Sequence, residues 1–220
     1  QYTHPVLLSF RYFDKTVESG LGSFVILNEE GWIMTAAHIL DPMFTFQQHA
    51  LEIEKYKAGM KNISSTDKSV SYFSPNPKWL VNYSHWWGAD HHRISTFMIL
   101  KENDFAIGKI ENYNPAFVSH YPILKNPDSL RNGTSLCKLG YPFYDVKASF
   151  NETNNSFVFD PSIFPIPRFP IEGIFTRNIH AGKSADGKYD VQYVETSSPG
   201  LRGQSGGPIF DVNGNIWAIQ

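Results

Sequence analysis

Gly203-Gln204-Ser205-Gly206-Gly207-Pro208 is the most informative stretch of the chain. It lies between an extended apolar segment and a later hairpin signal, and glycines surround its only serine. Glycine adopts backbone angles that side chains disfavour. The stretch therefore has the form of a tight loop that presents a serine hydroxyl, and it predicts a nucleophile loop.

Two earlier segments supply the groups that such a serine needs. Thr35-Ala36-Ala37-His38 ends one strand-like run, and Asp104-Phe105-Ala106-Ile107 opens another. A serine hydroxyl is a poor nucleophile until an imidazole takes its proton and a carboxylate orients that imidazole. His38, Asp104 and Ser205 are the candidates for these roles. The backbone N–H groups of Gly203 and Ser205 are the candidate donors to the oxyanion.

These segments resemble the trypsin-like (chymotrypsin-fold) serine peptidases, and within them the disulfide-poor bacterial and HtrA-like branch. The likeness runs with gaps from about residue 20 to the end, and further matches are Gly22-Ser23-Phe24-Val25-Ile26, Glu30-Gly31-Trp32-Ile33-Met34-Thr35 and Leu139-Gly140-Tyr141-Pro142-Phe143. The resemblance implies an all-β fold of two six-stranded antiparallel barrels. Residues 1–120 would carry His38 and Asp104, and residues 121–220 would carry Ser205.

The implied activity is hydrolysis of peptide bonds in protein or peptide substrates through an acyl-enzyme on Ser205, with no metal or organic cofactor. The alternative is a protease-like binding module that is catalytically silent or gated by a partner. The family continues beyond Gln220 with a strand that forms one wall of the specificity pocket, and the chain begins at Gln1. We therefore expect an incomplete second barrel within a larger, multidomain or regulated protein.

Two positions depart from the family pattern. Gln204 stands where zymogen-activated members carry an Asp that pairs with a freed N-terminus, so activation by that ion pair is not expected. Residues 199–202 would border the specificity pocket, and the first of them takes the place of trypsin's pocket carboxylate. The candidates for lining the pocket are Pro199, Gly200, Leu201 and Arg202. Arg202 and Arg177 are one hypothesis for selecting an acidic substrate residue, although Arg202 could equally face solvent.

Short β-like runs separated by turn residues also favour a barrel. Residues 23–27 and 32–36 flank a four-residue connection, and residues 209–210 and 216–219 flank a second hairpin signal with Asn213-Gly214 at its tip. Part of residues 46–61 is expected to be helical. Residues 145–168 gather Asn and Pro, which predicts a long loop.

Composition excludes some partners and leaves the compartment open. Lys and Arg number 19 against 21 Asp and Glu, which gives no electrostatic reason to expect nucleic acid. No apolar run is long enough to span a bilayer. Cys137 is the only cysteine, so this segment can form no internal disulfide, and a cytoplasmic location is favoured, with periplasmic or secreted locations still open. Its thiol is expected to be structural. Five sequons would matter only in a eukaryotic secretory setting: Asn62, Asn82, Asn132, Asn151 and Asn154.

A histidine-rich stretch raises one further hypothesis. His85-Trp86-Trp87-Gly88-Ala89-Asp90-His91-His92 contains imidazoles and a carboxylate, which are zinc ligands. Its spacing fits no tetrahedral template, so aromatic packing over the first barrel, or a partner surface, is the favoured interpretation.

Overall fold

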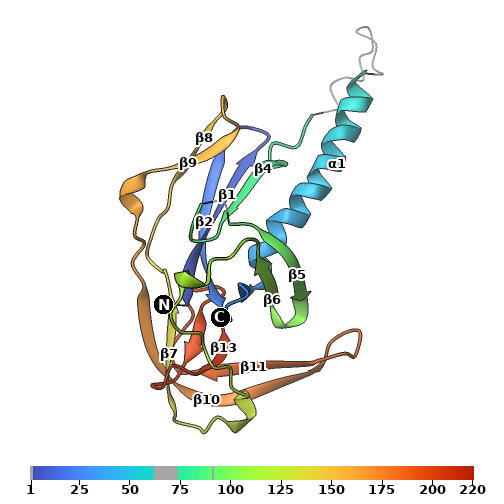
Figure 1. Ribbon diagram of the computed structural model, residues 1–220. Helices are drawn as coiled ribbons and strands as arrows, with labels where there is room; N and C mark the ends of the chain where they lie inside the picture. Colours follow the sequence, from blue (N-terminus) through green and yellow to red (C-terminus); the bar gives the residue numbers. More distant parts are fainter. Residues whose placement is uncertain (1, 62–73, 91) are drawn as a thin grey trace.

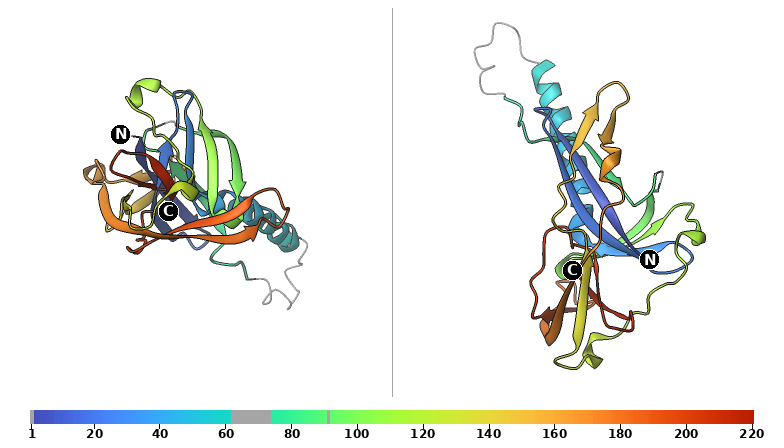
Figure 2. Two further views of the ribbon diagram at one scale, coloured as in Figure 1. Left: turned by 90° about the horizontal axis from the view of Figure 1, so that it is seen from below. Right: turned by 90° about the vertical axis from the view of Figure 1, so that its left-hand side faces the viewer.

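The computed structural model describes residues 2–61, 74–90 and 92–220 and contains two large antiparallel sheets, a separate two-stranded hairpin and one long helix. One sheet stands above the other in Figure 1, and the helix projects from the side of the upper sheet. The right-hand view of Figure 2 places both chain ends near the level at which the sheets meet. The predicted all-β, double-barrel plan is confirmed, with the helix as an addition to it.

The first sheet has six strands, as predicted. Their order is β4-β1-β2-β3-β6-β5, and their bounds are Thr3–Tyr12 (β1), Val17–Ile26 (β2), Trp32–Ala36 (β3), Leu80–Trp86 (β4), Ile94–Leu100 (β5) and Phe105–Ile110 (β6). The predicted hairpin between β2 and β3 is confirmed. Its turn is held by Asn28, whose side-chain oxygen accepts from the backbone N–H groups of Glu30 and Trp32.

Helix α1 spans Asp41–Lys61 and starts five residues earlier than the predicted helical segment. It follows the 3-10 turn η1 (Ala37–Leu40), which carries His38. The helix is tied to the first sheet by two hydrogen bonds across the base of β4. His49 Nδ1 accepts from Leu80 N at 2.8 Å, and Glu52 Oε2 accepts from Trp79 Nε1 at 2.6 Å. These contacts lie far apart in the sequence, so the helical period alone could not locate them.

The second sheet has five strands among the described residues, one fewer than the six of a complete barrel, and an incomplete second barrel is what the sequence predicts. Their order is β11-β10-β7-β12-β13, and their bounds are Ser135–Gly140 (β7), Phe169–Lys183 (β10), Asp190–Thr196 (β11), Pro208–Phe210 (β12) and Ile216–Ile219 (β13). The predicted hairpin between β12 and β13 is confirmed. Asp211 organises its turn by accepting from the backbone N–H groups of Asn213 and Asn215.

The prediction of a loop over residues 145–168 is wrong in part. Strands β8 (Ala148–Asn151) and β9 (Ser156–Phe159) form a separate hairpin there. Phe150 and Phe157 face each other across it with ring centroids 5.1 Å apart, and Asn151 caps the turn by accepting from two backbone N–H groups. The Asn residues that suggested a loop therefore belong to the turn of a hairpin.

The two sheets meet through buried polar and apolar contacts. Tyr141, at 1% exposure, donates its hydroxyl to the backbone oxygen of Thr3 at 3.1 Å. The last strand of the first sheet ends at Ile110 and the first strand of the second begins at Ser135. Short 3-10 turns at Pro115–Phe117 (η4) and Pro127–Ser129 (η5) lie between them, and a third, η6, spans Pro161–Ile163. A domain boundary at residue 120 stays a prediction.

Candidate active site

His38 and Asp104 are brought together by the register of two neighbouring strands. Ala36 at the end of β3 pairs with Phe105 at the start of β6, so the residues just beyond them face each other. His38 Nδ1 donates to Asp104 Oδ2 at 2.7 Å, and the His38 backbone N–H donates to Asp104 Oδ1 at 2.9 Å. Both side chains are about half exposed. Donation from Nδ1 leaves Nε2 as the basic nitrogen.

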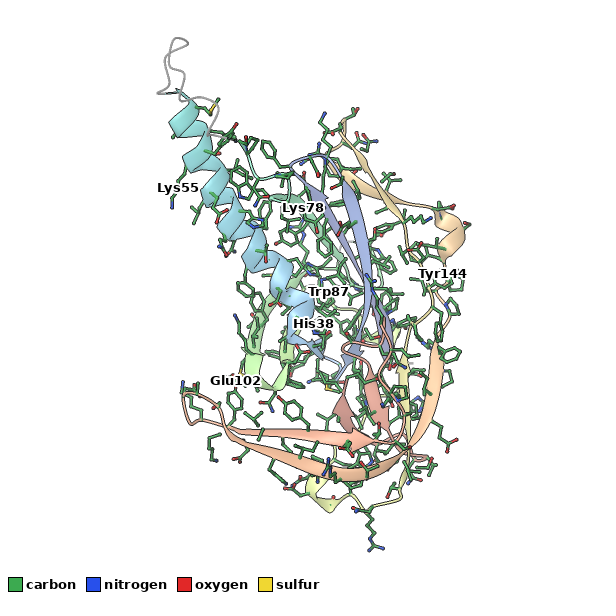
Figure 3. The ribbon with its side chains drawn as sticks, turned by 180° about the vertical axis from the view of Figure 1, so that it is seen from behind. His38, Lys55, Lys78, Trp87, Glu102 and Tyr144 are labelled. Carbon is green, nitrogen blue, oxygen red and sulfur yellow. The ribbon has the colours of Figure 1, made fainter. Side chains whose placement is uncertain are left out.

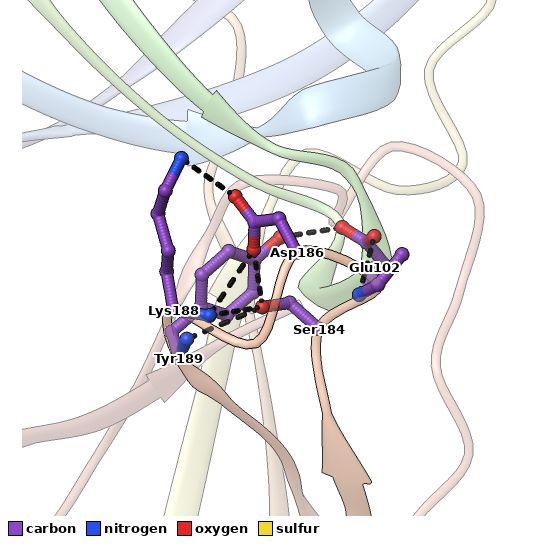
Figure 4. Close-up of polar contacts among 6 residues, drawn as sticks. Glu102, Ser184, Asp186, Lys188 and Tyr189 are labelled. Carbon is purple, nitrogen blue, oxygen red and sulfur yellow. Dashed lines mark hydrogen bonds and ion pairs between the residues drawn. The ribbon is translucent and has the colours of Figure 1, made fainter.

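Asp104 sits at the end of the 3-10 turn η3 (Lys101–Asn103) with a left-handed backbone, at φ +49°. A non-glycine residue rarely adopts that conformation without support. The β10–β11 hairpin of the second sheet holds the η3 turn that precedes Asp104, and Figure 4 shows the contact of its tip with Glu102. Tyr189 donates its hydroxyl to the Glu102 carboxylate, and Tyr193 donates to the Glu102 backbone oxygen at 2.6 Å. We call this set the Glu102 clamp.

The charges of the Glu102 clamp are consistent with a strong hydrogen bond. The Tyr189 hydroxyl lowers the pKa of Glu102, and the Glu102 carboxylate raises the pKa of Tyr189 to about 12. The proton therefore stays on the tyrosine at neutral pH. Figure 3 shows His38 at the base of α1 and Glu102 facing the hairpin tip. Sequence reasoning missed this clamp because its partners are 87 positions apart.

Two tight turns follow one another here, and Ser205 lies in the second. The first runs from Leu201 to Gln204 and is closed by the Gln204 N–H on the Leu201 carbonyl at 3.1 Å; the second is closed by the Gly207 N–H on the Gln204 carbonyl at 2.8 Å. Gly203 has φ +92° and Gly206 has φ +80°, each at the third position of its turn. A turn in which only the third residue has a positive φ is a type II turn, and glycine is favoured at that residue.

The turns leave two backbone donors free. Gln204, Gly206 and Gly207 use their N–H groups on carbonyls of the chain. Those of Gly203 and Ser205 donate to no group in the part of the chain that the structure describes. The type II turn fixes the direction of the Gly203 N–H, because type I and type II turns differ by a flip of their central peptide. The two free donors are the two predicted for the oxyanion.

The nucleophile turn packs directly on the first sheet. Ser23 on β2 donates its backbone N–H to the Ser205 carbonyl at 2.7 Å. A Cβ added to Gly206 would lie 2.1 Å from the Ser23 oxygen and 3.0 Å from the backbone nitrogen of Ala36, two residues before His38. Ser205 therefore lies beside the end of β3. Among the described residues, no hydrogen bond joins its hydroxyl to His38.

Gln204 has a structural role that the sequence did not reveal. Its side chain is 1% exposed, and its Oε1 accepts from the Leu201 N–H at 2.8 Å. The amide therefore braces the first turn from inside, at the position where zymogen-activated members of the resembled family carry an Asp. The only advance signal was the departure from that pattern.

The four predicted pocket residues separate into two pairs. Leu201 and Arg202 line a cavity of about 490 Å³ beside Gly203, with residues 19–21 and 141–146 on its other sides. Pro199 and Gly200 are exposed and do not line this cavity. Arg177 already pairs with Glu195 through Nη2 at 2.9 Å, so its charge is neutralised locally.

The histidine-rich stretch takes part in aromatic packing. His85 Nε2 donates to the backbone oxygen of Ile39, the neighbour of His38, at 2.7 Å. Its ring stacks on Trp87 with centroids 5.6 Å apart, and burial lowers its pKa. His91 lies outside the described residues, as does the sequon residue Asn62. Within the described ranges, no cluster of three or more His, Cys, Asp or Glu side chains could hold a metal ion.

Two further predictions concern single features. Cys137 is half-buried, and desolvation raises the pKa of its thiol, which agrees with a structural role. Of the helices in residues 2–61, 74–90 and 92–220, none has both the length and the apolar character needed to cross a membrane.

Comparison with known proteins gives one family match. The family model described as a trypsin-like peptidase domain matches residues 21–219, which include His38, Asp104 and Ser205. No curated protein sequence matches the chain.

Solved structures that resemble the chain are distant in sequence. They include the HtrA-type protease AlgW with a tripeptide, at 18% identity and a TM-score of 0.48, with 98% of this chain and 49% of that chain covered. The active form of the Rv3671c protease from M. tuberculosis is 14% identical with a TM-score of 0.46, with 98% and 68% covered. The chain thus spans about half the length of the HtrA-type structure.

Proposed function

This chain belongs to the trypsin-like peptidase domain family, and on that premise we propose that it is a serine endopeptidase with Ser205, His38 and Asp104 as its triad. The observation that carries the proposal is the hydrogen bond from His38 Nδ1 to Asp104 at 2.7 Å, beside a turn that presents Ser205. The carboxylate holds the imidazole in the tautomer whose Nε2 can accept the serine proton.

In the proposed reaction, Ser205 Oγ attacks the carbonyl carbon of the scissile bond while His38 Nε2 takes the hydroxyl proton. The oxyanion that forms is stabilised by the free N–H groups of Gly203 and Ser205. His38 then gives the proton to the leaving amine, and the acyl group stays on Ser205. A water molecule, deprotonated by His38, hydrolyses this ester and restores the serine.

One observation favours a second candidate function. The absence of a Ser205–His38 hydrogen bond in the described part of the chain is compatible with a module whose triad closes only when a partner is bound. Catalytic hydrogen bonds are often long in ligand-free enzymes and tighten on binding. The same observation therefore also fits an ordinary peptidase without substrate.

The test is covalent labelling of the full-length protein with a fluorophosphonate probe. We expect labelling that disappears in Ser205→Ala and falls strongly in His38→Ala, and a loss of about 10⁶-fold in kcat on peptides for either variant. Ser197→Ala, which changes a serine outside the turn, is the matched control. Absence of labelling in the wild type, alone and with added partners, would contradict the proposal.

A further inference from the structure

Lys138 is a buried lysine without a counter-ion. It lies on β7 with 6% exposure, and its Nζ donates to the backbone oxygen of Ser198. No carboxylate pairs with it in the part of the chain that the structure describes. Lysines are almost never fully buried unless they are paired. The Ser198 carbonyl satisfies one of the three ammonium donors, so the group can still bind an anion.

The position of Lys138 relates it to the nucleophile turn. Leu136, Lys138 and Gly140 alternate on the inner face of β7, and Leu136 belongs to the core of the second sheet. A Cβ on Gly140 would lie 2.6 Å from the Cα of Gln204, the residue before Ser205. Two residues along a strand cover about 7 Å. Lys138 is therefore about one side-chain length from the turn that presents the nucleophile.

The residue that Lys138 contacts carries a second donor. The Ser198 hydroxyl is buried and has no hydrogen-bond partner among the described residues. Its carbonyl, in contrast, accepts from both Lys138 Nζ and Thr196 Oγ1. Ser198 is followed directly by residues 199–202, which the sequence places at the border of the specificity pocket. An ammonium and a spare hydroxyl together form a receptor for a carboxylate.

Nearby acidic groups do not neutralise Lys138. Glu172 is opposite Cys137 in the register of β10 and β7, so it lies on the other face of the sheet, where it accepts from the Ser135 hydroxyl at 2.6 Å. Glu195 is occupied by Arg177. The inner face of β7 thus carries an uncompensated positive charge.

We propose that Lys138 makes this peptidase selective for substrates with a Glu or Asp side chain immediately before the scissile bond. The carbonyl that Ser205 attacks belongs to that residue, so its side chain is the one held nearest to the nucleophile turn. Its carboxylate would take the place of the missing counter-ion, with Ser198 as an additional donor. This inference rests on the proposed function.

The test uses matched peptides that differ only by Glu or Gln before the cleaved bond. We expect wild-type kcat/KM to favour Glu by about 10- to 100-fold, the range of a hydrogen bond to a charged group. Lys138→Met should bring the ratio close to one, whereas Lys138→Arg should keep a preference for Glu. Lys57→Met, which removes an exposed lysine on α1, is the matched control and should leave the ratio unchanged.

The cleavage profile of the wild type on a peptide library gives a second measurement that depends on no variant. A preference for apolar or basic residues before the bond, or an unchanged Glu/Gln ratio in a folded Lys138→Met protein, would overturn the inference. Fluorophosphonate labelling separates the two proposals. A labelled wild type without acidic preference rejects only the role of Lys138, and an unlabelled wild type rejects the peptidase itself.

Discussion

At the scale of single residues, the buried ammonium group of Lys138 carries a cost in stability. Burial lowers the pKa of its ammonium group from the ordinary lysine value of 10.5, because the charged form loses hydration. Below the lowered pKa the folded protein carries this penalty in full. Between the lowered pKa and 10.5 the unfolded chain binds more protons, so the free energy of unfolding rises with pH.

We therefore expect Lys138→Met to raise the free energy of unfolding at neutral pH by about 0.5–2 kcal/mol, the usual range for a single stabilising substitution. The Ser198 carbonyl keeps the Thr196 hydroxyl as its partner in the variant. Urea denaturation from pH 7 to pH 10.5 is the measurement, and the gain should shrink as the pH rises. A variant that is less stable than wild type across this range would contradict the argument.

At the scale of elements, the β10–β11 hairpin reaches from the second sheet to the turn that carries Asp104. The Glu102 clamp holds this turn through Tyr189 and Tyr193, and Asn103 Nδ2 donates to the backbone oxygen of Asp190 at 3.4 Å. Asp104 in turn orients His38. The second sheet thus contributes to the position of two residues that belong to the first.

Tyr189→Phe should lower kcat by about tenfold with little change in KM, because a small displacement of a catalytic group costs rate more than binding. The rate of fluorophosphonate labelling should fall in parallel. Lys188→Met is the control, since its ion pair with Asp186 stays within the hairpin tip. If kcat is unchanged while the melting temperature falls, Tyr189 is only structural.

Turn chemistry explains which elements could be predicted. The Asn28 and Asp211 turns are local, so the sequence predicts the β2–β3 and β12–β13 hairpins correctly. The sequence predicts a loop in place of the β8–β9 hairpin, because the Asn-rich turn dominates the pattern and the two strands have only four residues each. The burial of Lys138 could not be predicted for a related reason. A single polar residue in a short apolar run does not show which face of the sheet its side chain occupies.

At the scale of the whole molecule, the candidate site exists only while the two sheets are joined. The Ser23–Ser205 backbone hydrogen bond and the Tyr141 hydroxyl on Thr3 both cross the junction. Arg168 Nη2 adds a further hydrogen bond to the Thr3 carbonyl at 3.1 Å. We expect the sheets to unfold together rather than as independent units.

Tyr141→Phe should reduce the free energy of unfolding by about 1 kcal/mol, the usual net value of one buried hydrogen bond. Tyr144→Phe, in which the tyrosine is 36% exposed, is the control. Tryptophan fluorescence and far-ultraviolet circular dichroism should report one coincident urea transition, shifted to lower concentration. Two separate transitions, with only one of them shifted, would contradict a joint unfolding unit.

Short sequence patterns were sufficient to name the candidate triad and the oxyanion donors, because each lies among glycines or at a strand end that resembles the same family. They also predicted the β architecture, because strand and turn signals act over a few residues. The surroundings of that site become visible only in the folded chain: the Glu102 clamp, the brace from Gln204 and the unpaired charge of Lys138. Burial and pairing depend on residues far apart along the chain, and no local pattern encodes them.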